Sequence, residues 1–507
     1  MQSPTRYIPR LRTALVLTGT GTAGAYHAGV LRALQEAGVK IDLIAGRGIG
    51  VISAMFGAID GGSRLWENDG LWRTRGIRKL YRWRSVLRVA TFMCATAFVV
   101  VLVPFLALIA VLLAFACGLL LNLIGIGDQS LTSLYGSWLD VMFDPTALPV
   151  VVPQLLLVAV LLLLAVLFCG ALATDAQPHR HRRAKGSLLW RLIGAPLEIS
   201  PAVVWFSAGL WRIMKGAARI SQPSPRDLGT RYAELLAENL GQPGFKELLL
   251  LAHDLDARRD ITFALLEGQA RQSFFHGSLG LENERDFETV DLVNAEQHRT
   301  FDALAAALSL PIATDPHLMG FSPDSVWRGE THRVCDRPDS TSRLLSEVEK
   351  AGAQQVILVS ALPSAPGPHT LGAGRRDLRG QIGEQLVALE TAALRDAVSA
   401  RKGLFEALFE IRPDYNPLGP FDFGGCYDDR SDRRQTLAEL VDRGYEDGFK
   451  MFVDAVVGAS GEWMENESDH EQSIGSDSKN PSISEQLAAH GEHFSSTKDN
   501  SRPTSKS

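Results

Sequence analysis

The sequence predicts an α/β fold in which helices cover both faces of a mainly parallel sheet. The N-terminal part contains the succession strand, glycine turn and helix twice over. From residue 223 to 457, apolar runs of strand length alternate with helical patterns, as is typical of parallel strands joined by crossover helices. Two long uncharged runs separate these parts, which indicates that an insertion interrupts the fold.

The first succession begins with an apolar run at 13–17 that suits a buried strand. A glycine turn at 19–24 follows, and residues 25–37 carry apolar side chains at helical spacing. The second consists of an apolar run at 41–45, the turn 46–50 and a helical stretch at 51–59. Backbone N–H groups at such a turn and helix N-terminus can face a phosphate or an oxyanion.

Two kinds of site use this layout. A dinucleotide site needs an acidic residue near the end of the second strand, whereas the nearby acid, Asp42, lies at the start of that strand. A lipid acyl hydrolase uses the first turn as an oxyanion loop and the second as a G-x-S-x-G elbow, where a strained turn exposes a serine. The spacing of the glycines only partly distinguishes a dinucleotide site from a hydrolase site.

The stretches 15–34 (LVLTGTGTAGAYHAGVLRAL) and 41–60 (IDLIAGRGIGVISAMFGAID) resemble the start of a patatin-like phospholipase domain. The resemblance implies a three-layer sandwich, a glycine-rich oxyanion loop and a Ser–Asp dyad. The loop retains Gly19, Gly21 and Gly24, with Ala23 where the family usually has a basic residue. The elbow aligns with Gly46-Arg47-Gly48-Ile49-Gly50. Gly48 therefore occupies the position of the nucleophilic serine.

The resemblance extends over residues 12–61 and 223–457. The helix end at 306–311 resembles the small-residue helix end that precedes the family's Asp turn, and later matches lie at 409–413, 421–423 and 443–447. In this alignment Ser325 to Glu330 takes the place of the Asp turn. Arg328 then replaces the catalytic aspartate, and Glu330 the second glycine.

These residues predict a site that lacks both the nucleophile and the general base of a hydrolase. Glycine has no side chain that could attack a carbonyl, and arginine stays protonated and cannot act as a general base. Two substitutes are conceivable. Ser53 lies about one helical turn after Gly50, and Asp60 begins an Asp-Gly-Gly tripeptide that also suits a helix C-terminus. We expect His27 to be a packing or surface histidine.

The insertion predicts membrane contact. Residues 62–88 alternate arginines with aromatic side chains, as juxtamembrane segments do. Residues 89–126 and 148–174 carry no charge and are long enough for transmembrane helices, and the loop 127–147 carries acids but no Lys or Arg. A basic cluster follows at 179–185. The positive-inside rule then places both globular parts on the cytoplasmic side, as in an integral cytoplasmic-membrane protein. Residues 175–222 suit a basic, amphipathic interfacial segment, and for 188–214 a further span is the alternative.

Composition excludes several classes of function. The formal net charge of -6 argues against nucleic-acid binding. The spacing of the five cysteines suggests neither a zinc site nor disulfides. His253, Asp254 and Asp256 fit a charged β-turn better than a metal site, so we expect neither a metal nor another cofactor. The segment 458–507 is rich in Ser, Glu, Asp, Asn and Lys, as disordered tails are.

The sequence therefore predicts a membrane-anchored patatin-like protein that lacks the dyad. Such a pseudoenzyme would bind lipid or acyl chains, or act as a regulator, at the cytoplasmic face. One alternative is an active lipid acyl hydrolase with a displaced serine nucleophile. A second alternative is a nucleotide-binding membrane protein that uses Gly19 to Gly24 for phosphate.

Overall fold

The computed structural model describes residues 7–125, 133, 135–138, 140, 144, 148–175, 194–276, 285–293, 296–364, 377–401, 403–428 and 430–458. The predicted disordered tail lies outside the described residues except for its first position. The basic cluster 179–185 and most of the loop 127–147 also lie outside them.

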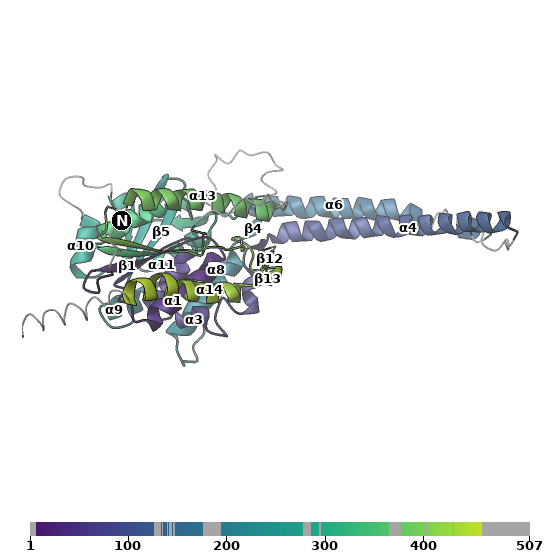
Figure 1. Ribbon diagram of the computed structural model, residues 1–507. Helices are drawn as coiled ribbons and strands as arrows, with labels where there is room; N and C mark the ends of the chain where they lie inside the picture. Colours follow the sequence, from purple (N-terminus) through teal and green to yellow (C-terminus); the bar gives the residue numbers. More distant parts are fainter. Residues whose placement is uncertain are drawn as a thin grey trace, which may run out of the picture.

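A nine-stranded sheet forms the centre of the fold (Figure 1). Neighbouring strands pair in parallel from one edge through β11 (Ala407–Ile411), β10 (Gln355–Ser360), β1 (Thr13–Thr18), β2 (Leu43–Arg47) and β5 (Glu247–Asp254). Beyond β5 the strands are antiparallel or mixed, with β6 (Arg259–Leu265), β7 (Thr289–Asp291), β8 (His317–Gly320) and β9 (Thr331–Cys335). The structure confirms the α/β fold with a mainly parallel sheet.

Alternate residues of each central strand face different cores. Leu15 and Leu17 belong to one apolar cluster, and Ala14 and Val16 belong to the other. The first cluster contains side chains of α1 (Ala23–Glu36), α2 (Gly50–Ala58), α8 (Ser200–Met214), α9 (Pro225–Asn239), α11 (Arg299–Leu308) and α14 (Leu437–Gly448). The second contains side chains of α10 (Gly268–His276), α12 (Thr341–Lys350) and α13 (Leu378–Arg401). The chain thus forms the three predicted layers.

The last part of the fold combines a small hairpin with a helix. β13 (Arg433–Gln435) pairs antiparallel with β12 (Cys426–Asp428). The helix α14 begins only after Thr436, whose side chain forms a capping box with Glu439. A π-helical segment, η3 (Phe449–Gly458), continues it.

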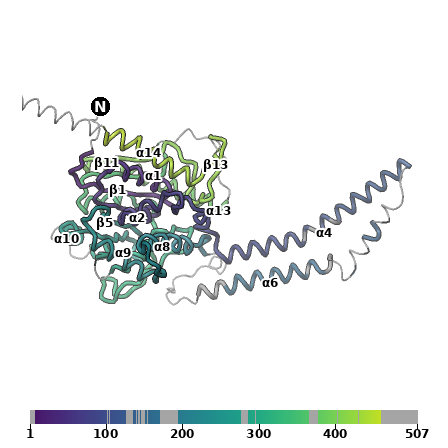
Figure 2. The backbone as a smooth tube through the Cα atoms, turned by 90° about the horizontal axis from the view of Figure 1, so that it is seen from below, coloured from purple at the N-terminus to yellow at the C-terminus, as the bar shows by residue number. Residues whose placement is uncertain are grey.

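A helical hairpin extends away from the α/β body (Figures 1 and 2). Its two helices are α4 (Ser85–Leu123) and α6 (Leu148–Asp175), which lie side by side. The helices predicted at 89–126 and 148–174 are therefore present. Among the described residues, no helix has both the length and the apolarity needed to cross a membrane. Their transmembrane character is thus unsupported.

The hairpin leaves and re-enters the body at one place. The short strand β3 (Arg82–Trp83) pairs antiparallel with β4 (Leu197–Glu198). Arg84 forms an ion pair with Asp315 and donates its backbone N–H to the carbonyl of Pro196. A small ladder therefore closes the insertion at its base.

The residues before the hairpin belong to the core, and the prediction of a juxtamembrane segment at 62–88 is wrong for its aromatic side chains. Trp72 and Tyr81 are each 1% exposed. Trp72 contacts the ring of Phe206, and Tyr81 stacks on Phe423. These side chains fill the body, while charged neighbours such as Arg78 are exposed.

The predicted interfacial segment is also partly wrong. Residues 200–214 form α8, whose apolar face packs into the first core through Ala202, Phe206 and Leu210, all at most 2% exposed. Because protein already covers this face, α8 neither requires an interface to cover it nor forms a further span.

Candidate active site

The second glycine turn forms the predicted elbow. β2 ends at Arg47, Gly48 has a positive φ of 54°, and α2 begins at Gly50. A strand that turns sharply into a helix through such a residue is the arrangement that exposes the nucleophile in hydrolases with this elbow. The backbone of the elbow is present, and its central residue has no side chain.

The space beside Gly48 is filled. A Cβ atom at this position would overlap the carbonyl oxygen of Gly19 and would lie 2.9 Å from Oδ2 of Asp336. The backbone N–H of Ile49, the residue after the elbow centre, donates to the same Gly19 carbonyl at 3.0 Å. The Gly19 carbonyl and the Asp336 carboxylate therefore fill the space that a serine side chain would occupy.

The carboxylate beside the elbow belongs to Asp336, which corrects the prediction for Arg328. Arg328 is exposed and lies in a turn of the 321–330 loop, before β9. Asp336 directly follows β9 and is 1% exposed. The D-G-G pattern missed it because Arg337 and Pro338 follow it instead of glycines. The available signal was an acid directly after the apolar pair Val334 and Cys335, which end a short strand.

Asp336 is held by a buried ion-pair network. Arg47 Nη1 donates to Asp336 Oδ1 and Oδ2 at 3.2 and 2.9 Å, and Arg47 Nη2 pairs with Glu390 of α13. Glu390 also accepts a hydrogen bond from the hydroxyl of Thr20 in the first glycine turn. All four residues are at most 3% exposed. One guanidinium thus joins β2, the end of β9, α13 and the glycine turn.

Burial controls the charges in this network. Burial raises the pKa of Asp336 and of Glu390 above the usual carboxyl range, and the nearby Arg47 opposes that rise. Burial by itself would lower the pKa of Arg47, but the two carboxylates raise it. A guanidinium does not give up its proton in proteins. Asp336 therefore faces a permanent positive charge, and any change of protonation in this network takes place on a carboxyl group.

The first glycine turn is covered by the chain itself. The N–H of Thr22 donates to the carbonyl of Pro420 at 3.1 Å, and the Thr22 hydroxyl donates to the carbonyl of Gly419 at 2.8 Å. Gly21 has φ 58° and lies so close to Pro420 that a Cβ would overlap its carbonyl. Donors that could face an oxyanion or a phosphate are thus occupied by backbone oxygens.

The two conceivable substitutes are not brought together. Ser53 is fully buried in α2, and its hydroxyl contacts His27 Nδ1 at 3.4 Å. The other ring nitrogen of His27 lies 3.1 Å from the carbonyl of Thr18, which can only accept, so Nε2 carries the proton. Asp60 lies just beyond the C-terminal end of α2 and has a positive φ of 54°. His27 is a packing histidine, as expected.

The charged turn after β5 is a β-hairpin turn. Asp254 accepts the N–H groups of Asp256 and Ala257, and His253 contacts Asp260 at 2.7 Å. Within the described part of the chain, no group of three or more His, Cys, Asp or Glu residues could hold a metal ion.

More than half of the chain matches a known protein family. A family model described as "Patatin-like phospholipase" matches residues 15–333. The chain belongs to the patatin-like phospholipase family. The match spans the glycine turn, the elbow and the helical hairpin, and it ends shortly before Asp336.

Relatives share a short segment with this patatin-like chain. The proteins named "Patatin-like phospholipase domain-containing protein 6" from Mus musculus, Pongo abelii and Homo sapiens are 45% identical to it over 60 residues. That segment is 12% of this chain, and the chain spans 4% of the length of these relatives. The crystal structure of VipD from Legionella pneumophila matches with 11% identity and a TM-score of 0.28, over 87% of this chain and 67% of that chain. A similarity that low supports no inference.

A serine restored at the elbow should not restore hydrolysis. In Gly48→Ser the new side chain would meet the Gly19 carbonyl and Asp336, and overpacking of this kind costs about 1–3 kcal/mol. We expect no ester turnover above the parent protein and a lower free energy of unfolding, measured by denaturant titration.

The matched control is Gly38→Ser. Gly38 has a similar φ of 64°, and no heavy atom lies within 4 Å of the position that its Cβ would take, so this variant reports backbone strain without the clash. Serine-dependent turnover in Gly48→Ser that Asp336→Asn abolishes would contradict this picture of the site.

Acid should destabilise the fold through His27. Burial lowers the pKa of His27 to about 4 from an ordinary value of 6.5, so the folded state binds its proton less readily than the unfolded state. The stability that this residue contributes is present above pH 6.5 and is lost as the pH falls toward about 4, a loss of about 3 kcal/mol. Free energies of unfolding across this range should fall less steeply for His27→Gln, and parallel profiles would show that His27 is not responsible.

Proposed function

We propose that this protein is a patatin-like pseudoenzyme that binds lipid or acyl chains without hydrolysing them. The observation that carries the proposal is the filled elbow. Gly48 supplies no nucleophile, and Asp336 is paired with Arg47 instead of facing a hydroxyl. Acyl transfer requires a nucleophile beside a base, with an oxyanion site near both.

Backbone carbonyl groups occupy both the position of the nucleophile and the glycine turn that would bind an oxyanion. The carbonyl of Gly19 lies where the serine side chain would be, and it also accepts the N–H of Ile49. The carbonyl of Pro420 accepts the N–H of Thr22 in the glycine turn. In serine proteases, loss of the catalytic groups leaves only the modest catalysis of oxyanion hole and binding. Here the donors of such a hole are engaged as well.

A displaced nucleophile is the second candidate because Ser53 has a histidine partner. The Ser53 hydroxyl contacts Nδ1, the unprotonated nitrogen of His27, as a nucleophile contacts its general base. Two facts oppose this candidate. Both side chains are completely buried, and burial lowers the pKa of His27 to about 4, far from the value of an efficient base at neutral pH.

Hydrolysis assays on the full chain decide between these candidates. We expect no turnover of short-chain esters or phospholipids and no labelling by a fluorophosphonate probe, because the Ser53 hydroxyl, which lies beside His27, is completely buried. Labelling or turnover that disappears in Ser53→Ala, while a fully active patatin-like hydrolase serves as positive control, would establish the displaced nucleophile and end the pseudoenzyme proposal.

We further propose that the hairpin brings this protein to a membrane, with the α/β body on the cytoplasmic face. Support comes from the large apolar side chains that α4 and α6 expose, such as Phe98 at 65%, Leu113 at 61% and Leu161 at 56%. A monomeric soluble protein rarely exposes an apolar surface of this extent. The basic residues Arg84 and Arg88 flank the start of α4 and suit the charged surface of a cytoplasmic leaflet.

Flotation with vesicles tests the membrane proposal. The full chain should co-float with phospholipid vesicles, and the combined change Phe98→Glu, Leu113→Glu and Leu161→Glu should abolish this. The control carries Leu389→Glu and Leu404→Glu, which place charges at exposed leucines of the α/β body. Equal flotation of all three proteins, or flotation of none, would reject membrane association through the hairpin.

A further inference from the structure

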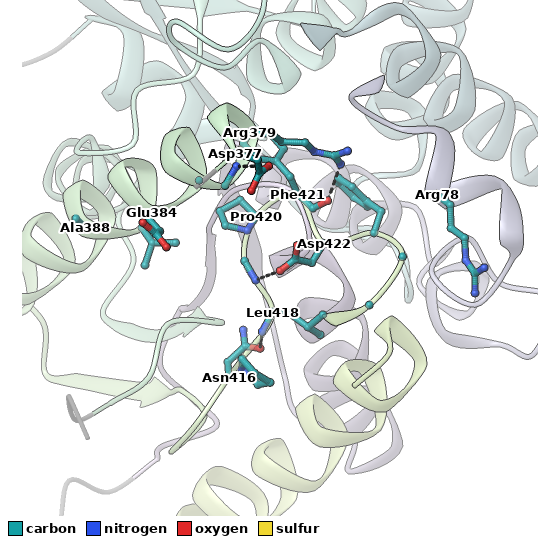
Figure 3. Close-up of a pocket in the computed structure, with 18 residues that line it drawn as sticks. Arg78, Asp377, Arg379, Glu384, Ala388, Asn416, Leu418, Pro420, Phe421 and Asp422 are labelled. Carbon is teal, nitrogen blue, oxygen red and sulfur yellow. Dashed lines mark hydrogen bonds between the residues drawn. The ribbon is translucent and has the colours of Figure 1, made fainter. Parts of the chain in front are cut away.

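A cavity of 710 Å³ lies beside the covered glycine turn (Figure 3). Its walls are the N-terminal half of α13 and the loop 416–425, and Arg78 also belongs to its lining. The volume is in the range of cavities that hold small organic ligands. Pro420 separates the cavity from the first glycine turn, because it lines the cavity while its carbonyl accepts the N–H of Thr22.

Most charged side chains of the cavity hold its walls together. Asp377 accepts the N–H of Gly380 at 3.0 Å at the start of α13, and Asp422 accepts the N–H of Gly419 at 2.8 Å. Arg379 donates to the carbonyl of Phe421 at 2.6 Å and so fastens the helix to the loop. These groups are occupied by the fold, and Figure 3 shows their hydrogen bonds.

Arg78 differs from them. It is exposed, and within the described part of the chain its guanidinium has no hydrogen-bond or ion-pair partner. A guanidinium keeps its charge and presents several N–H donors in a planar fork suited to carboxylate or phosphate. The cavity therefore has a cation on one wall that is available to an anionic group.

Apart from Asn416 and the exposed carboxylate of Glu384, the remaining lining is mainly apolar. Val387 and Ala388 of α13 face the cavity, as do Pro417, Leu418 and Phe421 of the loop. An aliphatic chain gains about 0.8 kcal/mol for each methylene group that it buries. A ligand with one anionic end and one aliphatic chain would use both kinds of surface.

We propose that this cavity binds a single-chain amphiphile with an anionic head group. The head group would pair with Arg78, and the chain would lie along Val387, Ala388 and Leu418. Either a fatty-acid carboxylate or the phosphate of a single-chain lipid supplies this chemistry. The inference deepens the proposed lipid-binding function and names a site for it that is separate from Gly48 and Asp336.

Calorimetry with three probes of equal chain length tests the head group. Dodecanoate, dodecyl phosphate and dodecyltrimethylammonium are titrated into the full chain below their micelle concentrations. We expect the anions to bind roughly tenfold or more tightly than the cation, the effect of one charge-assisted hydrogen bond. The better of the two anions identifies carboxylate or phosphate as the head group. Equal affinity for anions and cation would overturn the proposal.

Two pairs of variants locate the site. Arg78→Gln should remove the preference for anions, whereas Lys79→Gln, at the exposed neighbour outside the lining, should keep it. Ala388→Trp should fill the cavity and abolish binding, whereas Ala400→Trp, at an exposed position further along α13, should not. Amphiphile bound to the hairpin is common to all four variants and cancels in the comparison.

Binding unchanged in both Arg78→Gln and Ala388→Trp would overturn this site. Melting temperatures confirm that each variant folds, and Arg78→Gln, at a surface position, keeps the test valid if the tryptophan is not tolerated. The outcome is independent of hydrolysis. Failure here leaves the pseudoenzyme proposal standing, and esterase activity would reject that proposal without affecting the binding data.

Discussion

The ion pair between Arg47 and Asp336 is the interaction on which the rest of the site depends. Both side chains are 1% exposed, and Arg47 extends the network to Glu390. Removing one member of such a buried network would leave an uncompensated charge in the interior. The network fixes α13 and the end of β9 against the elbow, and it engages the Asp336 carboxylate that lies beside Gly48.

This interaction is compatible with the elbow only because residue 48 is glycine. The positive φ alone would not require glycine, since hydrolases place a strained serine in such a turn. The closeness of the Gly19 carbonyl and of Asp336 leaves no room for a side chain. The turn of the family is therefore preserved, while the space beside Gly48 is occupied by the Gly19 carbonyl and by Asp336 with its partner Arg47. The protein's binding capacity would then lie beyond Pro420, in the cavity along α13.

Periodicity and glycine spacing predicted the sheet and both glycine turns. They could do so because a buried parallel strand must be apolar and a sharp turn into a helix needs small residues. Asp336 was not predictable from the motif, because Arg337 and Pro338 replace the glycines that mark the family's turn. Glu390 was not predictable either, since only the tertiary fold brings α13 to Arg47. The segment around Trp72 was misassigned because alternating arginines and aromatic residues look alike at a membrane surface and at the edge of a core.

The most direct test of this account is a double-mutant cycle on the buried pair. Free energies of unfolding are measured for the parent, Arg47→Met, Asp336→Asn and the double variant. We expect that Arg47→Met costs about 3–5 kcal/mol and that adding Asp336→Asn recovers part of this loss, because one of the two stranded carboxylates is removed. Additive effects of the two substitutions would show that Arg47 does not hold Asp336, and the account of the filled elbow would be wrong.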